Sequence, residues 1–364
     1  MRSSVFAIVA YAGLLVAPLA SANAQAPIEL EIGAPWEHPH SGIVVPDTIG
    51  GLPRGSATEF AQDFLNIGFS FPSSDGSEEI SLYIYRHTNG AVPVWFRQAQ
   101  TGIEIRDIYA KPELAFGVEQ YGWPGAEEWQ GLRAIYATPN SRTALSTAVV
   151  LFSIDGWLVK MRVSSSTKSP EELGQMIDAA FAELTPPEAK VAQAPAVPVE
   201  DCEKKLRFKK AQDAEPDAGS AILGALLGGL VSRGEPGESE EGEAIAPEPA
   251  SVWCRDSSLG PVQVAYRADG AADAYLLAIS DSGKGIWVGP DTAGQILQSE
   301  RPNSKPNYSI TLITDNRRIN YVPQNRLPSL RRVLEVVNAN RTVSRVSTWG
   351  DDTSINIQSG VLEN

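Results

Sequence analysis

The stretch ALSTAVVLFSIDGWLVKMRVSSSTKSPEELGQMIDAAFAEL, residues 144–184, decides the fold class of this chain. It contains two apolar runs, 144–154 and 157–163, that are rich in residues favouring extended structure. Asp155-Gly156 separates these runs, and this dipeptide is typical of a tight turn between antiparallel strands. Residues 144–163 of the stretch therefore predict a β-hairpin.

The last third predicts a helix over 169–184. Ser169 can cap its start, Pro170 suits the first helical position, and Glu172 completes a capping box. One stripe of apolar residues at helical spacing would face a sheet. The stripe comprises Leu173, Met176, Ile177, Ala180, Phe181 and Leu184.

Similar patterns predict strands on both sides of this stretch. The expected strands before it are Phe64–Phe71, Ile80–Tyr85, Val92–Phe96 and Leu132–Ala137, with a turn at Asn89-Gly90. Those after it are Val262–Tyr266, Ala274–Ile279, Ile286–Val288, Tyr308–Ile313 and Arg318–Val322, followed by a helix over 328–337. We expect an α+β fold of two small domains, each an antiparallel sheet with a packed helix.

Composition changes along the chain predict its division into segments. Residues 1–24 read as a signal peptide and 25–184 as the first α+β domain. A Pro-rich, low-complexity linker over 185–251 carries a basic run, a Gly-rich apolar segment and an acidic stretch. Residues 252–347 form the second α+β domain, and 348–364 a C-terminal tail.

The length of 364 residues suits about two domains. A formal charge of −14 argues against nucleic-acid binding, which needs clustered positive charge. The hydrophobic fraction of 43% is enough for folded cores. We find no complete motif for a cofactor, a metal ion or a catalytic triad, so the sequence leans towards a protein that is not an enzyme.

The start of the chain predicts export. Arg2 precedes an apolar run over 5–20, and Ala22 and Ala24 fit the small residues before a signal-peptidase site, so we expect cleavage after Ala24. The run is too short to serve as a spanning helix. A periplasmic or secreted location follows, and in that oxidising compartment Cys202 and Cys254 are expected to form a disulfide.

Three short stretches near the N-terminus carry a family resemblance. They are Ile43-Val44-Val45-Pro46, Ile49-Gly50-Gly51-Leu52-Pro53-Arg54 and Leu82-Tyr83-Ile84-Tyr85. Together they resemble the opening quarter of uncharacterised secreted proteins from Gram-negative bacteria. The resemblance implies an α+β envelope protein and no known activity.

Several patterns invite a catalytic or metal-binding interpretation, and each has a simpler one. His38 and His40 lack further ligands at motif spacing, so we expect loop histidines on a mobile arm. Ser165-Ser166-Thr167-Lys168 has the Ser-x-x-Lys form of acyl-transfer enzymes, but their other two motifs are absent. Ser282-Gly283-Lys284-Gly285 lacks the remaining residues of a phosphate loop and fits a hairpin turn.

The acidic pairs and the tryptophans also have simple structural interpretations. Glu127-Glu128 and Asp351-Asp352 fit a solvated surface better than a glycosidase site. The eight Trp residues could form a ligand platform, but they fill cores more often.

The most unusual segment is apolar and Gly-rich, residues 220–231. Its candidate contact residues are Ala221, Ile222, Leu223, Gly224, Leu226, Leu227, Gly228, Leu230 and Val231. The segment could bind a groove of a partner, or lie on a membrane surface with the basic run 204–210 against anionic lipid. Alternatively, it is a short helix inside the loop that the disulfide closes. We expect no spanning helix after signal cleavage.

Two classes of function remain open. The leading hypothesis is a non-catalytic envelope module that binds a protein partner or the membrane surface through residues 220–231. The alternative is a periplasmic hydrolase whose carboxylates converge in a cleft of the first domain, where their pKa values would be raised. A third, weaker hypothesis is a ligand-binding domain that uses exposed Trp residues.

Overall fold

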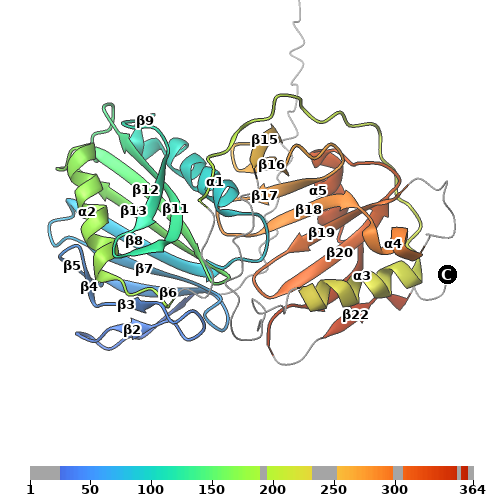
Figure 1. Cartoon of the computed structure of the whole chain (residues 1–364), viewed down its shortest axis with the longest axis horizontal. Coiled ribbons are helices and arrows are strands. Elements are labelled where there is room, and N and C mark those ends of the chain that lie inside the picture. Colours follow the sequence, from blue (N-terminus) through green and yellow to red (C-terminus); the bar gives the residue numbers. More distant parts are fainter. Residues whose placement is uncertain (1–24, 189–194, 232–251, 298–305, 351–353, 360–364) are drawn as a thin grey trace, which may run out of the picture.

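The computed structural model describes residues 25–188, 195–231, 252–297, 306–350 and 354–359, without the side chains of Glu127 and 227–231. The expected signal peptide and acidic stretch (235–248) lie outside these ranges. In the described residues the chain forms two sheet-rich bodies, and most strand pairs are antiparallel (Figure 1).

The first body is built on a nine-stranded sheet in the part of the chain that the structure describes. In spatial order its strands are β1 (Ala26–Pro27), β6 (Ser56–Ala61), β7 (Asn66–Pro72), β8 (Glu78–Arg86), β13 (Trp157–Ser165), β12 (Ser146–Ile154), β11 (Ala126–Ala137) and β10 (Glu119–Trp123). β9 (Glu113–Leu114) pairs with β11 off this path. Two small hairpins, β2 (Trp36–Glu37) with β3 (Val44–Val45) and β4 (Thr48–Ile49) with β5 (Leu52–Pro53), accompany it.

The hairpin predicted over 144–163 is confirmed as β12 and β13. Asp155 and Gly156 turn the chain with φ angles of 40° and 82°, a conformation that suits a two-residue hairpin loop. The predicted helix is α2 (Pro170–Glu183), and its capping box is formed by Ser169 and Glu172. The first sheet and its helix therefore begin where the local signals place them.

Both faces of the first sheet are buried. Alternate residues of β12 point to opposite faces, so Val150 and Phe152 join the core that contains α2, whereas Val149 and Leu151 join a second core. This second core contains α1 (Val92–Glu104), which crosses the other face of the sheet (Figure 1). A strand that is apolar at nearly every position is what such a two-sided environment requires.

The strand expected at Val92–Phe96 is wrong, because these residues form the first turns of α1. Pro93 is tolerated there, because backbone N–H groups in the first turn of a helix have no acceptor within the helix. The absence of an N–H on proline therefore costs no hydrogen bond. Gly90 has a φ of 72°, and Trp95 Nε1 donates to the carbonyl of Asn89 at 2.7 Å. Asn89-Gly90 thus leads into a helix instead of a hairpin.

The second body is a nine-stranded sheet among the described residues. Its strands follow chain order: β14 (Glu200–Asp201), β15 (Trp253–Ser258), β16 (Gln263–Ala268), β17 (Tyr275–Ile279), β18 (Gly285–Pro290), β19 (Tyr308–Ile313), β20 (Arg317–Gln324), β21 (Thr342–Ser347) and β22 (Ile355–Ile357). Its helices are α3 (Ala218–Val231), α4 (Thr292–Leu297) and α5 (Leu330–Asn338). A 3₁₀ turn, Asp107–Tyr109, follows α1 in the first body.

The two bodies share the core around α1. Tyr266 and Leu276 from the second sheet join Trp95 and Phe96 in it. At the edge of this contact, the turn after β17 enters the first body, where Asp281 pairs with Lys160 at 2.8 Å and Arg162 at 2.7 Å. Asn89 Nδ2 also donates to the carbonyl of Gly283 at 2.9 Å. Helix α1 is therefore a layer between two sheets.

Candidate functional site

The apolar segment 220–231 lies within helix α3. The carboxylate of Asp217 accepts hydrogen bonds from the backbone N and the hydroxyl of Ser220, both at 2.7 Å, and so caps the helix start. Leu227, Gly228, Leu230 and Val231 belong to the helix, but their side chains are outside the described set.

The inner face of α3 packs on its own chain. Ala225 is fully buried, and Ala221 packs against the core that contains α5. A methyl group at Gly224 would lie 3.6 Å from Cβ of Ala293 in α4. Gly224 and Gly228 have the Gly-x-x-x-Gly spacing that is typical of closely packed helices. Gly224 thus permits close contact between α3 and α4 of the same chain.

The outer face of α3 carries exposed aliphatic side chains. Ile222 is 42% exposed and Leu226, one turn later, is 48% exposed. Ile296 of α4, the helix against which α3 packs, is also exposed. We call Ile222 and Leu226 the outer face of α3. The helix has no charged residue between Ala218 and Val231, so this face is purely apolar.

The basic run 204–210 is a strap on the second body. Leu206 and Phe208 alternate with the cations and pack on the core that contains α5, where the Phe208 ring meets Tyr275 edge-on at 5.9 Å. The carbonyl of Lys204 accepts from Arg267, and Lys205 Nζ donates to the Arg255 carbonyl at 3.0 Å. This packing ties the run to the second sheet.

The predicted disulfide is present. Cys202 and Cys254 are bonded, with Cα atoms 4.9 Å apart. Cys202 directly follows β14 and Cys254 lies in β15, and these two strands pair in parallel. None of the helices in the described ranges has the length and apolarity that a membrane crossing requires.

A cavity of about 290 Å³ lies between the inner face of α3 and the second sheet. Its walls include Asp217, Gly224 and Asp291, and its floor includes Trp287 and Arg318. Sequence reasoning missed this cavity. The signal that could have revealed it is polar residues at alternate positions of otherwise apolar strands, as at Ser309 and Thr311.

The prediction of histidines on a mobile arm is wrong for His38, which is fully buried. Its Nε2 lies 3.0 Å from the Phe64 carbonyl, and its Nδ1 accepts from the backbone N of Ser41 at 3.1 Å. These partners fit the neutral ring with the proton on Nε2. Burial, the largest cause, lowers the pKa of His38 to about 4.

His40 and His38 belong to a cluster of aromatic rings that come from both bodies. Its ring stacks on Trp157 and meets Trp349 edge-on at 4.8 Å. Trp349 in turn donates to the Asp63 carboxylate and lies under the guanidinium of Arg86, 4.8 Å from the ring centre. Within the described residues, no three His, Cys, Asp or Glu side chains are grouped to hold a metal ion.

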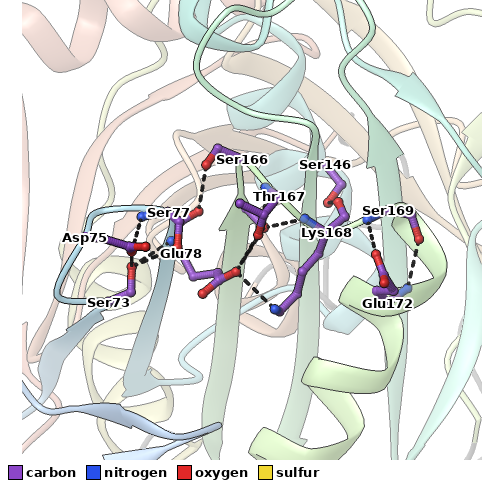
Figure 2. Close-up of polar contacts among 11 residues, drawn as sticks. Ser73, Asp75, Ser77, Glu78, Ser146, Ser166, Thr167, Lys168, Ser169 and Glu172 are labelled. Atoms are coloured by element: carbon purple, nitrogen blue, oxygen red, sulfur yellow. Dashed lines mark hydrogen bonds and ion pairs between the residues drawn. The ribbon is translucent and has the colours of Figure 1, made fainter.

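The Ser-x-x-Lys stretch forms a structural network (Figure 2). Lys168 Nζ pairs with the Glu78 carboxylate at 3.0 Å, and Thr167 donates to the same oxygen at 2.8 Å. Ser165 Oγ accepts from the backbone N of Lys168 at 2.9 Å. The Thr167 bond is the main cause that lowers the pKa of Glu78. This lysine is held by a carboxylate, which argues against its use as the base for Ser165.

Other sequence candidates take structural roles. Residues 280–284 form the turn between β17 and β18, as predicted, and Gly283 has a φ of 76°. Trp123, Trp129 and Trp157 are buried core residues. Asp351-Asp352 lie outside the described residues.

The hydrolase hypothesis expects acids with raised pKa values in the first body. Among the described residues, the carboxyl groups whose pKa is raised are Asp291 and Asp315, and burial is the main cause for both. Both belong to the second body, and Asp315 pairs with Lys284 at 2.7 Å. The hydrolase hypothesis thus gains no support from these groups.

No protein-family model matches this chain, and no curated protein matches it. Among solved structures, one similar chain is the solution structure of cyanobacterial PsbP (CyanoP) from Synechocystis sp. PCC 6803. The match has 12% sequence identity and a TM-score of 0.29, and covers 43% of this chain and 95% of that chain. The function proposed below rests on this chain's own residues.

Proposed function

We propose that this chain is an exported envelope protein, periplasmic or secreted, that acts as a non-catalytic binding module. The outer face of α3 binds a protein partner that offers an apolar surface. The observation that carries the proposal is the exposure of Ile222 and Leu226 on a helix without charged residues. The export signal, the disulfide and the resemblance to secreted proteins support the location.

A protein partner fits this face better than a membrane surface does. Helices that lie on membranes carry Lys and Arg on their polar side, and α3 has neither. The acidic chain would also be repelled by anionic lipid head groups.

Covering this face supplies part of the free energy of a specific contact. Fully burying a Leu or Ile side chain contributes about 1.5–3 kcal/mol, so covering the exposed halves of Ile222 and Leu226 contributes about 1 kcal/mol each. Residues at the centre of an interface commonly dominate its binding free energy.

The experiment compares two pairs of exposed isoleucine or leucine side chains. Ile222→Gln/Leu226→Gln changes the outer face of α3, and Ile105→Gln/Ile108→Gln changes side chains of similar exposure on the first body. The mature protein is captured from native envelope fractions, with a photo-crosslinking residue at position 226 in a parallel sample. We expect the α3 pair to lose the stoichiometric, crosslinked partner and the control pair to keep it.

Substitution is preferable to deletion because Ala221 and Ala225 of the same helix pack on the second body. Retention of the partner by the α3 pair contradicts the proposal. So does a crosslink from position 226 that joins two copies of this chain, because the partner is then the chain itself.

A further inference from the structure

The floor of the cavity beneath α3 contains a row of polar side chains. Trp287, Thr311, Asn320 and Ser344 are direct neighbours across β18 to β21, so their side chains share one face. Thr311 donates to Asn320 Oδ1 at 2.8 Å, and Asn320 Nδ2 donates to Ser344 Oγ at 2.9 Å. Thr311 and Ser344 are buried, where apolar side chains would cost less free energy to desolvate.

Arg318 is the cation of this floor. It lies two residues before Asn320 on β20 and therefore points to the same face. Within the described residues its guanidinium has neither an ion pair nor a hydrogen-bond partner, and burial lowers its pKa. Three other buried or partly buried cations are paired by contrast: Arg162 with Asp281, Arg267 with Asp256 and Lys284 with Asp315.

The wall beside α3 supplies carboxylates that do not pair with Arg318. Asp291 accepts from the backbone N of Gly294 at 3.1 Å, and Asp217 is engaged with Ser220. Burial, reinforced by the negative charge of Asp217, raises the pKa of Asp291. The cavity thus has a free cation on its floor and hydrogen-bond acceptors on its wall.

We propose that this cavity binds a small monocarboxylate that also carries hydroxyl or ammonium groups. The Arg318 guanidinium holds the carboxylate, because its planar fork matches that group. The hydroxyl of Ser344 and the amide of Asn320 lie on the same floor, and Asp291 accepts from the donors of the ligand. A volume of about 290 Å³ is near the lower limit for small-molecule sites.

The charges favour a single carboxylate over a phosphate. Arg318 offers a single positive charge, and the acidic groups of Asp217 and Asp291 in the same cavity disfavour a ligand with more than one negative charge. This site is independent of the outer face of α3, because it uses the inner face and the sheet.

The test uses isothermal titration calorimetry on the full mature chain. The probes are sodium glycerate, gluconate and glucuronate and zwitterionic L-serine, with glucose as the neutral comparison and inorganic phosphate as the comparison anion. We expect saturable binding of at least one carboxylate and none of glucose. Arg318→Gln should weaken binding at least tenfold, since a charge-assisted hydrogen bond contributes that much.

Arg317→Gln is the matched control, because Arg317 is the exposed neighbour on the opposite face of β20. It should bind like the wild type, as should Ile222→Gln/Leu226→Gln, which tests the other proposal. Without ligand, Arg318→Gln should melt no lower than the wild type, since it removes an unpaired, partly buried charge.

Absence of saturable carboxylate binding at millimolar concentration overturns the proposal. Equal affinities of the wild type and Arg318→Gln also overturn it, as does phosphate binding as tight as the best carboxylate. If Arg318→Gln does not fold, Arg318→Lys replaces it, and there we expect weaker binding because the charge remains but the planar fork is lost.

Discussion

The imidazole of His38 is held neutral by its surroundings. Both ring nitrogens have backbone partners, and the ring packs edge-on to Trp157 with 4.5 Å between centres. Protonation would place a second hydrogen on Nδ1, opposite the N–H of Ser41. The low pKa of about 4 therefore has a geometric as well as a solvation cause.

This side chain should make the fold sensitive to acid. Its pKa is lower in the folded state than the ordinary 6.5, so its contribution is complete above pH 6.5 and is lost as pH falls towards 4. The loss amounts to about 3 kcal/mol. Urea unfolding at pH 7, 5.5 and 4 should show a shallower pH dependence for His38→Gln than for the wild type. Equal slopes would contradict this account.

Little of this environment is visible in the sequence. His38 and His40 lie among Trp36 and two prolines, a composition typical of a loop. The rings that they contact, Trp157 and Trp349, are distant along the chain. Only the three-dimensional structure brings these rings together, so sequence reasoning placed the histidines on a mobile arm.

Helix α2 shows an element whose start is specified locally. Ser169 Oγ accepts from the backbone N of Glu172 at 3.3 Å, and the Glu172 carboxylate accepts from the backbone N of Ser169 at 2.8 Å. Figure 2 shows this pair beside the network around Glu78. The cap fixes where α2 begins.

Removing the cap should measurably lower the free energy of unfolding. Ser169→Ala should lower the free energy of unfolding by about 1 kcal/mol, because a backbone N–H at the helix start loses its acceptor. Ser166→Ala, three residues earlier and exposed, should change it by less than about 0.5 kcal/mol. Chemical denaturation of both variants gives the comparison, and similar losses for the two would refute the capping role.

Helix α1, in contrast to α2, is not specified by its local sequence. Apart from Pro93, the stretch Val92–Phe96 consists of residues that favour strands, and it follows Asn-Gly, so local preference indicates a hairpin. The continuation decides otherwise, because Ala99 and Ile103 extend a helical spacing of buried residues from Val92 and Phe96. Tertiary burial between two sheets overrides the local preference.

At the scale of the whole molecule, Asp281 joins the two bodies. Burial alone would raise its pKa, but the charges of Lys160 and Arg162 outweigh that effect and lower it to about 2. Lys160 also lies over the rings of Tyr83 and Tyr85. The turn after β17 thus carries the negative charge that two buried cations of the first body require.

Asp281→Asn should therefore be strongly destabilising. It leaves Lys160 and Arg162 buried without their carboxylate, a loss of about 3–5 kcal/mol. Asp201→Asn, which breaks the exposed pair with Lys205, should cost less than about 1 kcal/mol. Differential scanning calorimetry would measure both, and a small effect of Asp281→Asn would show that the junction does not depend on this pair.

Many of the strands and the disulfide could be predicted from the sequence, because alternation and cysteine pairing are local or countable signals, although the strand expected at Val92–Phe96 was wrong. The junction could not be, since it depends on Trp95 meeting Leu276 across the two bodies. The candidate sites divide in the same way. Composition identified the apolar segment 220–231, which the structure places in helix α3, whereas Arg318 becomes a candidate only because its guanidinium has no partner in the described residues.

The place of α1 between two sheets has a consequence for how the chain is made. The ribosome synthesises α1 and the first sheet before β16 and β17. The side of α1 that packs on the second sheet is therefore made before the strands that bury it. That side must stay uncovered until Tyr266 and Leu276 emerge. During synthesis this surface is a natural binding site for a chaperone.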